Sequence, residues 1–188
     1  KITTFITRGD NIESIHGIKC IVLNNKKEIL LSTNHNKDLI FPRSSIKIFQ
    51  ALPFILSGAN KEYNLNSRQV ALACSSHTGE NFHLVDLKKW FKKLKIKINK
   101  LKCGIHNPIN LESSNKLLLS GNSPDQLHNN CSGKHLAMLS SCLVNNYNLN
   151  NYLETNHPHQ KNIRKILELY MNKKINKNQY SIDGCSAP

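Results

Sequence analysis

The sequence predicts a mixed α/β protein of the α+β kind, in which a β-hairpin precedes a mostly helical body. Two observations support this prediction. Short apolar runs separated by a polar turn occupy residues 1–40, and apolar side chains recur every three or four positions after Pro42. The chain has 188 residues, 39% of them hydrophobic, which suits one domain with a real core. We therefore expect residues 1–188 to form a single domain.

The hairpin is expected from residues 17–23 and 28–33, which are rich in Ile, Val and Leu and flank a polar turn at 24–27. Residues 102–130 are predicted to form a long irregular connection. Apolar residues at helical spacing predict five helices, over 44–57, 67–75, 81–96, 131–144 and 158–171.

Local signals mark the ends of these helices. Gly58 should end the first helix, and Pro53 should kink or split it. Ser67 and Asn81 are candidate N-caps, and Pro158 suits the first turn of the last helix.

The two ends of the sequence look cut. The chain begins without Met and stops at Pro188, directly after a motif. A single hairpin also leaves the sheet short of strands. We therefore expect an incomplete sheet and the N-terminal part of a longer protein.

Neither a membrane span nor an export signal is visible. No apolar run approaches the roughly 20 residues that cross a bilayer, and Lys1–Phe5 lacks the apolar stretch of a signal peptide. The six cysteines are therefore expected to be reduced thiols in the cytoplasm. Cys20, Cys74 and Cys142 lie among apolar residues and are expected to pack in the interior.

The formal net charge is +14, which raises the question of a nucleic-acid partner. The lysines are spread along the chain among many Asn and Ile residues, as a biased genome would produce. The densest cluster, Lys88–Lys100, falls on an amphipathic helix and reads as its solvated face. Because no RNA-binding aromatic signature or zinc-finger spacing accompanies it, we predict no nucleic-acid partner.

The first chemical motif is Ser44-x-x-Lys47 at a helix start. Side chains three positions apart share a helical face, and an amine there can accept the serine proton. The preceding Arg43 and the helix N-terminus would both favour the neutral amine. The spacing is weak by itself, because residues 113–116 repeat it in a predicted loop. The competing interpretation is a capping serine with a surface lysine.

The second motif, Cys74–Glu80, joins a helix end to a turn and is rich in hydroxyl groups, with an imidazole and a carboxylate. Helix capping by Ser, Thr and Gly is the alternative interpretation. His157 and His159, which flank Pro158, are expected to cap the helix or lie in a solvated turn rather than to bind a metal.

The third motif, Leu127–His135, carries a thiol, an amine and two imidazoles, and Asp183–Cys185 supplies a second thiol far along the chain. A phosphate loop is excluded, because it lacks the required glycine at 128 and the hydroxyl after the lysine. A thiol nucleophile remains open, as does a thiol that merely packs at a helix start. A zinc site would combine Cys131 and Cys185 with a nitrogen donor, for which three residues are candidates. They are His128, His135 and Lys134.

Taken together and in order, these segments resemble the L-asparaginase II family of the rhizobial type. The resemblance extends over essentially the whole chain. Its residues are Thr7–Gly9 with Glu13, Ser14 and His16; Arg43–Lys47 with Gln50–Pro53; Ala73–Glu80; Leu127–His135; His157, Pro158 and Gln160; and Asp183–Cys185.

The resemblance implies a serine hydrolase fold akin to β-lactamases and glutaminases, and hydrolysis of L-asparagine to L-aspartate and ammonia. It makes Ser44 and Lys47 the first serine–lysine tandem and Ser76 the serine of the second, whose lysine is expected beyond Pro188. Arg43 matches an arginine beside the first serine.

The resemblance also implies zinc, with Cys131, Lys134 and Cys185 as ligands and water as the fourth. His135 and Asp183 would hold the water shell of the metal and face the substrate. A homodimer is a further expectation. Two departures are mild: Ser186 and Ala137 occupy positions where the family commonly has glycine. The alternative to the enzyme is an inactive truncated remnant or a zinc-binding module without catalysis.

Overall fold

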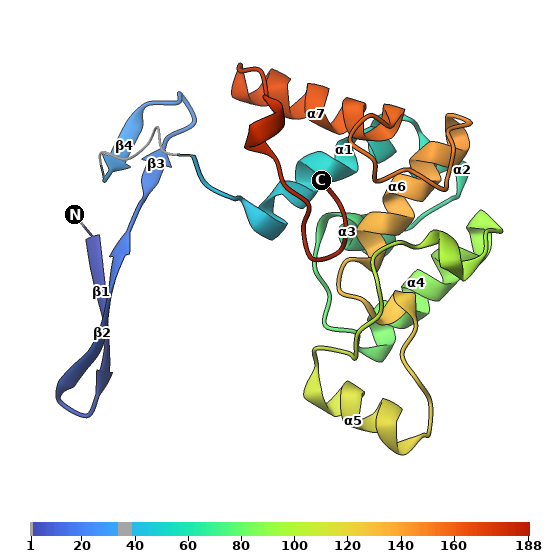
Figure 1. The fold of residues 1–188 in the computed structure, drawn as a ribbon, viewed down its shortest axis with the longest axis horizontal. Coiled ribbons are helices and arrows are strands. Elements are labelled where there is room, and N and C mark those ends of the chain that lie inside the picture. Colours follow the sequence, from blue (N-terminus) through green and yellow to red (C-terminus); the bar gives the residue numbers. More distant parts are fainter. Residues whose placement is uncertain (1, 34–38) are drawn as a thin grey trace. The chain divides into compact units, whose positions relative to one another are not determined.

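Residues 2–33 and 39–188 are described by the structure, a computed structural model (Figure 1). They fall into a β unit, Lys1–Phe41, and a helical unit, Pro42–Pro188. The described residues contain seven α-helices and two small antiparallel sheets, which confirms the α+β composition. That residues 1–188 form a single domain stays a prediction.

The β unit consists of two hairpins rather than one. Strands β1 (Ile2–Arg8) and β2 (Asn11–Ile18) pair antiparallel, with a register shift after Ile6. Strands β3 (Ile21–Leu23) and β4 (Ile29–Ser32) form the predicted hairpin. The prediction was wrong in starting its first strand at residue 17, because residues 17 and 18 end β2. The apolar residues of β1 and β2 alternate with Thr, Ser and His, a weaker signal than the continuous run in β3.

All five predicted helices are confirmed. They are α1 (Lys47–Leu56), α3 (Ser67–Cys74), α4 (Asn81–Leu94), α6 (Ser132–Val144) and α7 (Pro158–Met171). A 3-10 turn, Arg43–Ile46, leads into α1, which then runs through Pro53 without a break. The predicted split there is therefore wrong, while Gly58 follows the end of α1 with a left-handed backbone, as expected.

Helix α6 forms the centre of the helical unit and is buried from Ser132 to Cys142. It packs against α1, α3 and α4, and α7 lies against α1 (Figure 1). Trp90 of α4 is fully buried and donates from its indole nitrogen to Ser140 Oγ of α6 at 3.0 Å. The core thus holds fixed the N-terminal end of α6, where the third motif lies.

Two cap predictions are wrong. Asn66, not Ser67, caps α3, and a reciprocal bond from Gln69 completes a capping box. Asn81 is the first residue of α4, and the preceding Glu80 makes no capping bond. A capping residue must lie outside the first turn, and both predictions placed it one residue too far along the chain.

Two helices were not predicted. The short α2 (Ala59–Glu62) follows Gly58, and α5 (Leu111–Leu119) interrupts the segment expected to be irregular. Asn110 caps α5 by accepting from Ser113 N at 2.8 Å. Residues 113–116 therefore lie on a helix rather than in a loop. No helix in residues 2–33 and 39–188 combines the length and apolar character needed to cross a bilayer.

Candidate active site and metal centre

The structure brings Ser44, Lys47 and Ser76 together. Lys47 begins α1 and its side chain is 2% exposed, whereas both serine residues are open to solvent. Its Nζ donates to Ser76 Oγ at 2.7 Å and to the carbonyl of Ser75 at 3.2 Å. The hydroxyls of Ser44 and Ser76 lie 3.1 Å apart. The three side chains therefore form one hydrogen-bonded chain that runs from a buried amine to two accessible hydroxyls.

The order of that chain differs from the one expected from spacing. Within the described ranges, the Lys47 amine makes no hydrogen bond to Ser44, its partner in the motif, and reaches it through Ser76. The cause is the packing of α3 against α1, which brings the residues after α3 up to the amine.

The third motif and the C-terminal turn also meet. Lys134, on the first turn of α6, is 1% exposed and donates to Cys185 Sγ and Asp183 Oδ2, each at 2.9 Å. Cys185 Sγ lies 2.9 Å from Asp183 Oδ1 and is hydrogen-bonded to Cys131. The two cysteines, which are distant in sequence, thus share one cluster with the amine.

The two thiols of this cluster are shifted in opposite directions. The hydrogen bond from Cys185, with the nearby Lys134 and Lys47, outweighs burial and lowers the pKa of the Cys131 thiol. The same bond and burial raise the pKa of Cys185. Because Lys47 contacts both Cys131 and Ser76, the serine pair and the thiol cluster form one continuous site.

Asp183 organises the turn that carries Cys185. Its Oδ1 accepts from the backbone nitrogens of Cys185 at 2.9 Å and Ala187 at 3.0 Å. Burial acts to raise the pKa of Asp183, but hydrogen bonds from Cys185 and Lys134 outweigh it and lower the pKa to about 2. The carboxylate therefore stays ionised and is available to hold the turn and Lys134.

Ser186 in this turn has φ of +64°, a left-handed backbone that favours glycine. Ser186→Gly should raise the free energy of unfolding by about 0.5–1 kcal/mol. Glycine relieves the backbone strain of the folded state, and this gain exceeds the loss caused by the greater conformational entropy of the unfolded chain. Urea unfolding measures this change. Ser186→Ala keeps the strained backbone and should give no gain, so a gain shared by both variants would contradict the explanation.

His135 is fully buried and directly follows Lys134. Its Nδ1 lies 2.6 Å from the hydroxyl of Tyr152, which itself accepts from Lys102 N at 3.0 Å. The tyrosine proton therefore points to Nδ1, and the neutral ring carries its hydrogen on Nε2. Burial and Lys134 lower the pKa of His135 to about 3. Nε2 makes no hydrogen bond of ordinary geometry among the described residues, and the backbone of Cys185 lies close to the ring.

Arg43 directly precedes Ser44 in the 3-10 turn that leads into α1. It is exposed, has φ of +50°, and forms no hydrogen bond or ion pair within the described part of the chain. Its guanidinium is therefore free to bind an anionic group beside Ser44.

The other nitrogen candidates for a metal lie in different surroundings. His128 Nδ1 pairs with Asp125 at 2.8 Å, and His157 caps α7, as predicted, by accepting from His159 N. No three His, Cys, Asp or Glu side chains in residues 2–33 and 39–188 are arranged to hold a metal. A centre with Cys131 and Cys185 therefore depends on the Lys134 amine.

The donors at this cluster suit zinc, which is bound by thiolates and nitrogen. Burial acts to lower the pKa of Lys134, but contacts with Cys185 and Asp183 outweigh it and raise the pKa. Metal binding must therefore displace a firmly held proton. The convergence of two sulfurs and the amine fits a metal ion.

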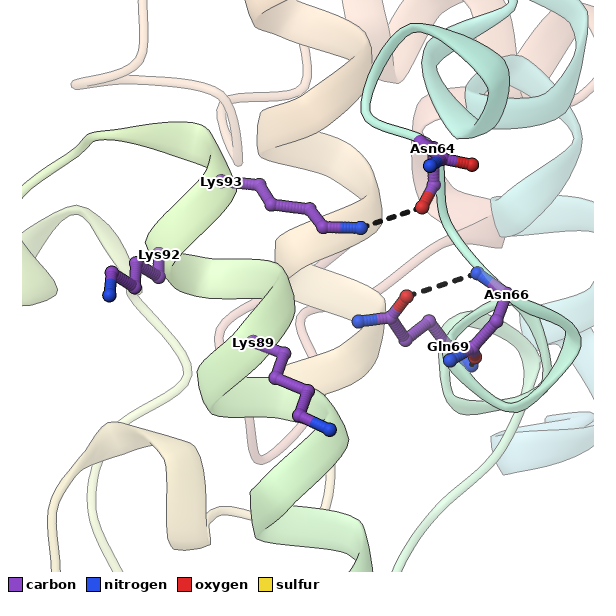
Figure 2. A pocket seen from close by; sticks show the side chains of 6 residues that line it. All are labelled: Asn64, Asn66, Gln69, Lys89, Lys92 and Lys93. Carbon is purple, nitrogen blue, oxygen red and sulfur yellow. Dashed lines mark hydrogen bonds between the residues drawn. The ribbon is translucent and has the colours of Figure 1, made fainter.

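A large pocket lies elsewhere, between the α2–α3 connection, α3 and α4. It has a volume of about 390 Å³ and contains none of the predicted site residues (Figure 2). Lys93 Nζ donates there to the carbonyl of Asn64 at 2.6 Å. Its walls combine exposed lysine stems with amide groups, and those of Asn66 and Gln69 are already hydrogen-bonded. The serine–lysine–thiol cluster is the better candidate because it contains reactive groups in mutual contact.

Sequence reasoning missed two residues of this site, His77 and Tyr152. His77 was noted only as part of a hydroxyl-rich segment, yet it is 3% exposed and its Nε2 lies 2.8 Å from Ser132 Oγ. Its place directly after Ser76 was a signal. Tyr152 carries no signal in the sequence, because only the packing of the α6–α7 connection brings it to His135.

One comparison with known proteins identifies the chain. No curated protein matches it significantly. The sequence profile described as L-asparaginase II matches residues 5–188, almost the whole chain, including both serines and the thiol cluster. The chain therefore belongs to the L-asparaginase II family.

Proposed function

We propose that this protein is an amidohydrolase that converts L-asparagine to L-aspartate and ammonia through a serine–lysine site. The observation that carries the proposal is the hydrogen-bonded chain Lys47 Nζ–Ser76 Oγ–Ser44 Oγ, with distances of 2.7 and 3.1 Å. Membership of the L-asparaginase II family supports the substrate. A fold akin to β-lactamases and glutaminases is part of the same proposal.

The Lys47 amine acts first as a base. A serine oxygen attacks the side-chain amide carbon of asparagine, and the hydroxyl proton moves to the neutral amine. The ammonium then protonates the leaving nitrogen, and ammonia departs from an aspartyl-serine ester. Water attacks the ester, again with Lys47 as the base, and releases aspartate. Backbone N–H groups are expected to stabilise the oxyanion.

Two proton routes fit the geometry, and they differ in which serine carries the ester. Ser76 can attack directly, because it is bonded to Lys47. Ser44 can attack if its proton passes through the Ser76 hydroxyl to Lys47. Arg43 would bind the substrate α-carboxylate, since it is an unpaired cation beside Ser44 among the described residues.

Ser44→Ala and Ser76→Ala test both routes. Ser76→Ala should lower ammonia release from asparagine by about 10³-fold or more on either route, because it removes the hydroxyl that contacts Lys47, whereas Ser44→Ala should do so only if Ser44 carries the ester. Mass spectrometry of rapidly quenched reactions should find the aspartyl ester on one of the two serines. Unchanged rates in both variants would reject the mechanism.

Zinc is proposed for the thiol cluster. Cys131, Lys134 and Cys185 would hold the ion, with a water ligand kept in place by His135 and Asp183. A bound zinc ion supplies a fixed positive charge that can polarise a substrate oxygen or shape the pocket. The residues themselves exclude water from the cluster, since Cys131, Lys134, His135 and Cys185 are all buried.

Titration of the metal-free protein with zinc against a chromophoric chelator should give one site. Cys131→Ser and Cys185→Ser should each weaken zinc by at least about tenfold, because a hydroxyl is a poor substitute for a thiolate ligand. Cys142→Ser is the control, since that thiol is also buried but lies outside the cluster. Equal zinc binding by all four proteins would exclude this centre.

A second candidate function is a zinc-binding protein without catalysis. One observation favours it. Among the described residues, Lys47 is the single lysine hydrogen-bonded to the serine pair, through Ser76, whereas the thiol cluster has all three proposed ligands. Stoichiometric zinc with no ammonia release from asparagine would select this alternative. A cytoplasmic location, a homodimer and the absence of a nucleic-acid partner stay predictions.

A further inference from the structure

His77 directly follows Ser76 but lies in a different environment. Ser76 is exposed, whereas His77 is 3% exposed. Its backbone N–H donates to the carbonyl of Asn130 at 3.1 Å, and its Nε2 lies 2.8 Å from Ser132 Oγ. Asn130 and Ser132 are the two neighbours of Cys131. His77 therefore links the segment that carries Ser76 to both neighbours of Cys131.

The direction of these hydrogen bonds is fixed by their partners. The backbone N–H of Gly79 donates to His77 Nδ1 at 3.2 Å, so that nitrogen carries no hydrogen. The neutral ring then carries its hydrogen on Nε2 and donates it to Ser132 Oγ. The Ser132 hydroxyl passes its own hydrogen to the carbonyl of Leu127 at 3.0 Å. Every polar atom of the imidazole is used, and none is left for proton transfer.

The hydrogen bonds between the segment 75–80 and the segment 127–135 among the described residues all involve His77. The turn before α6 has its own supports. Asn129 binds Cys131 N at 2.8 Å and the carbonyl of Cys103 at 2.7 Å, and His106 accepts from Asn130 N at 3.0 Å. The turn is therefore held without His77, and what His77 adds is its position relative to Ser76.

We propose that His77 is a positioning residue that locks the Ser76 hydroxyl and the Cys131 sulfur to each other. The inference rests on the proposed function, because it assigns His77 to the joint between the serine site and the zinc site. Loss of the imidazole removes the side-chain bond to Ser132 and leaves only the backbone bond to Asn130, so Ser76 can shift relative to Cys131. Both zinc affinity and the rate of the chemical step then fall.

The experiment compares three variants of the chain. His77→Ala removes the bond to Ser132, while His77→Gln keeps an amide nitrogen that can donate to it. His157→Ala is the matched control, because His157 is 4% exposed, accepts from a backbone N–H two residues on, and places Nε2 3.0 Å from the carbonyl of Asn148. His157 lies outside both clusters. Zinc affinity, kcat and KM for asparagine, and thermal unfolding are measured for each.

We expect His77→Ala to weaken zinc by about tenfold and to lower kcat by about 10–100-fold with little change in KM, the range found for residues that orient metal ligands. His77→Gln should recover most of both losses. His157→Ala should lower the unfolding temperature and leave zinc affinity and kcat unchanged.

The inference would be overturned if folded His77→Ala bound zinc as tightly as the wild-type chain. It would also be overturned if His157→Ala lost as much zinc affinity as His77→Ala. A wild-type chain that binds no zinc overturns it as well. A wild-type chain that binds zinc but releases no ammonia counts against the proposed function alone. The zinc titrations of the three variants then decide the role of His77.

Discussion

Lys47→Met abolishes ammonia release from asparagine while the chain keeps its helical fold. The methionine side chain has a similar length and fills the buried space, but it offers no base to Ser76, whose Oγ lies 2.7 Å from the Lys47 amine. Removal of a general base costs about 10²–10⁴ in rate. Because the amine also contacts Cys131, zinc affinity should change in the same variant. The assay measures ammonia at saturating asparagine, with circular dichroism as the check on folding.

Two further variants make this result specific. Lys47→Arg keeps the charge but cannot act as a base at neutral pH, so it should be as inactive as Lys47→Met. Lys116→Met is the matched control, because Lys116 ends the second Ser-x-x-Lys sequence but is 74% exposed and pairs with Glu112 on the surface of α5. Activity retained in Lys47→Arg would show that the amine serves only as a positive charge, and the proposed mechanism would be wrong.

The two Ser-x-x-Lys sequences show what spacing alone can predict. Both lie on helices or helix starts, and both bring a serine and a lysine to one face. They differ in burial, since Lys47 is 2% exposed and Lys116 lies on the surface. Burial comes from the packing of α1 against α3 and α6, which no local pattern encodes. The sequence could therefore name Ser44 and Lys47 as candidates but not select them.

Helices were predictable where local signals and packing agree. The last predicted helix coincides with α7, because Pro158 opens it and an apolar stripe faces α1. Helix α5 was missed because it lacks a buried stripe: Leu111 is 74% exposed and Leu119 is 87% exposed. Its signal was the cap at Asn110, which the prediction of an irregular connection overlooked.

The candidate site likewise combines features that the sequence could predict with features that depend on packing. The types of reactive group were visible in the motifs, and the meeting of Cys131 with Cys185 follows the resemblance to the family. The pairing of Lys47 with Ser76 rather than Ser44 could not be predicted, because it depends on how two helices pack. The same holds for the bond from Tyr152 to His135, which joins the α6–α7 connection to the core.

The contact between α3 and α6 allows the sharpest test of this dependence on packing. At Gly133 an added Cβ would lie 2.2 Å from the carbonyl oxygen of Leu72 and 2.7 Å from its carbonyl carbon. Both are backbone atoms, so a side-chain rotation cannot relieve the clash. Elsewhere in a helix, Gly→Ala stabilises by about 1 kcal/mol, so a loss of stability here can only come from this contact.

Gly133→Ala should therefore lower the free energy of unfolding by about 3 kcal/mol or more, the upper range for overpacked cores. Urea unfolding measures this loss, with Gly184→Ala as the control, because a Cβ at Gly184 meets nothing within 4 Å. The folded fraction of Gly133→Ala should also bind zinc more weakly, since Lys134 directly follows the displaced residue and Cys131 lies two positions before it. An unfolding midpoint equal to that of the unmodified chain would mean that the helices can separate freely. In that case the packing of α3 on α6 could not be what brings Ser76 to the thiol cluster.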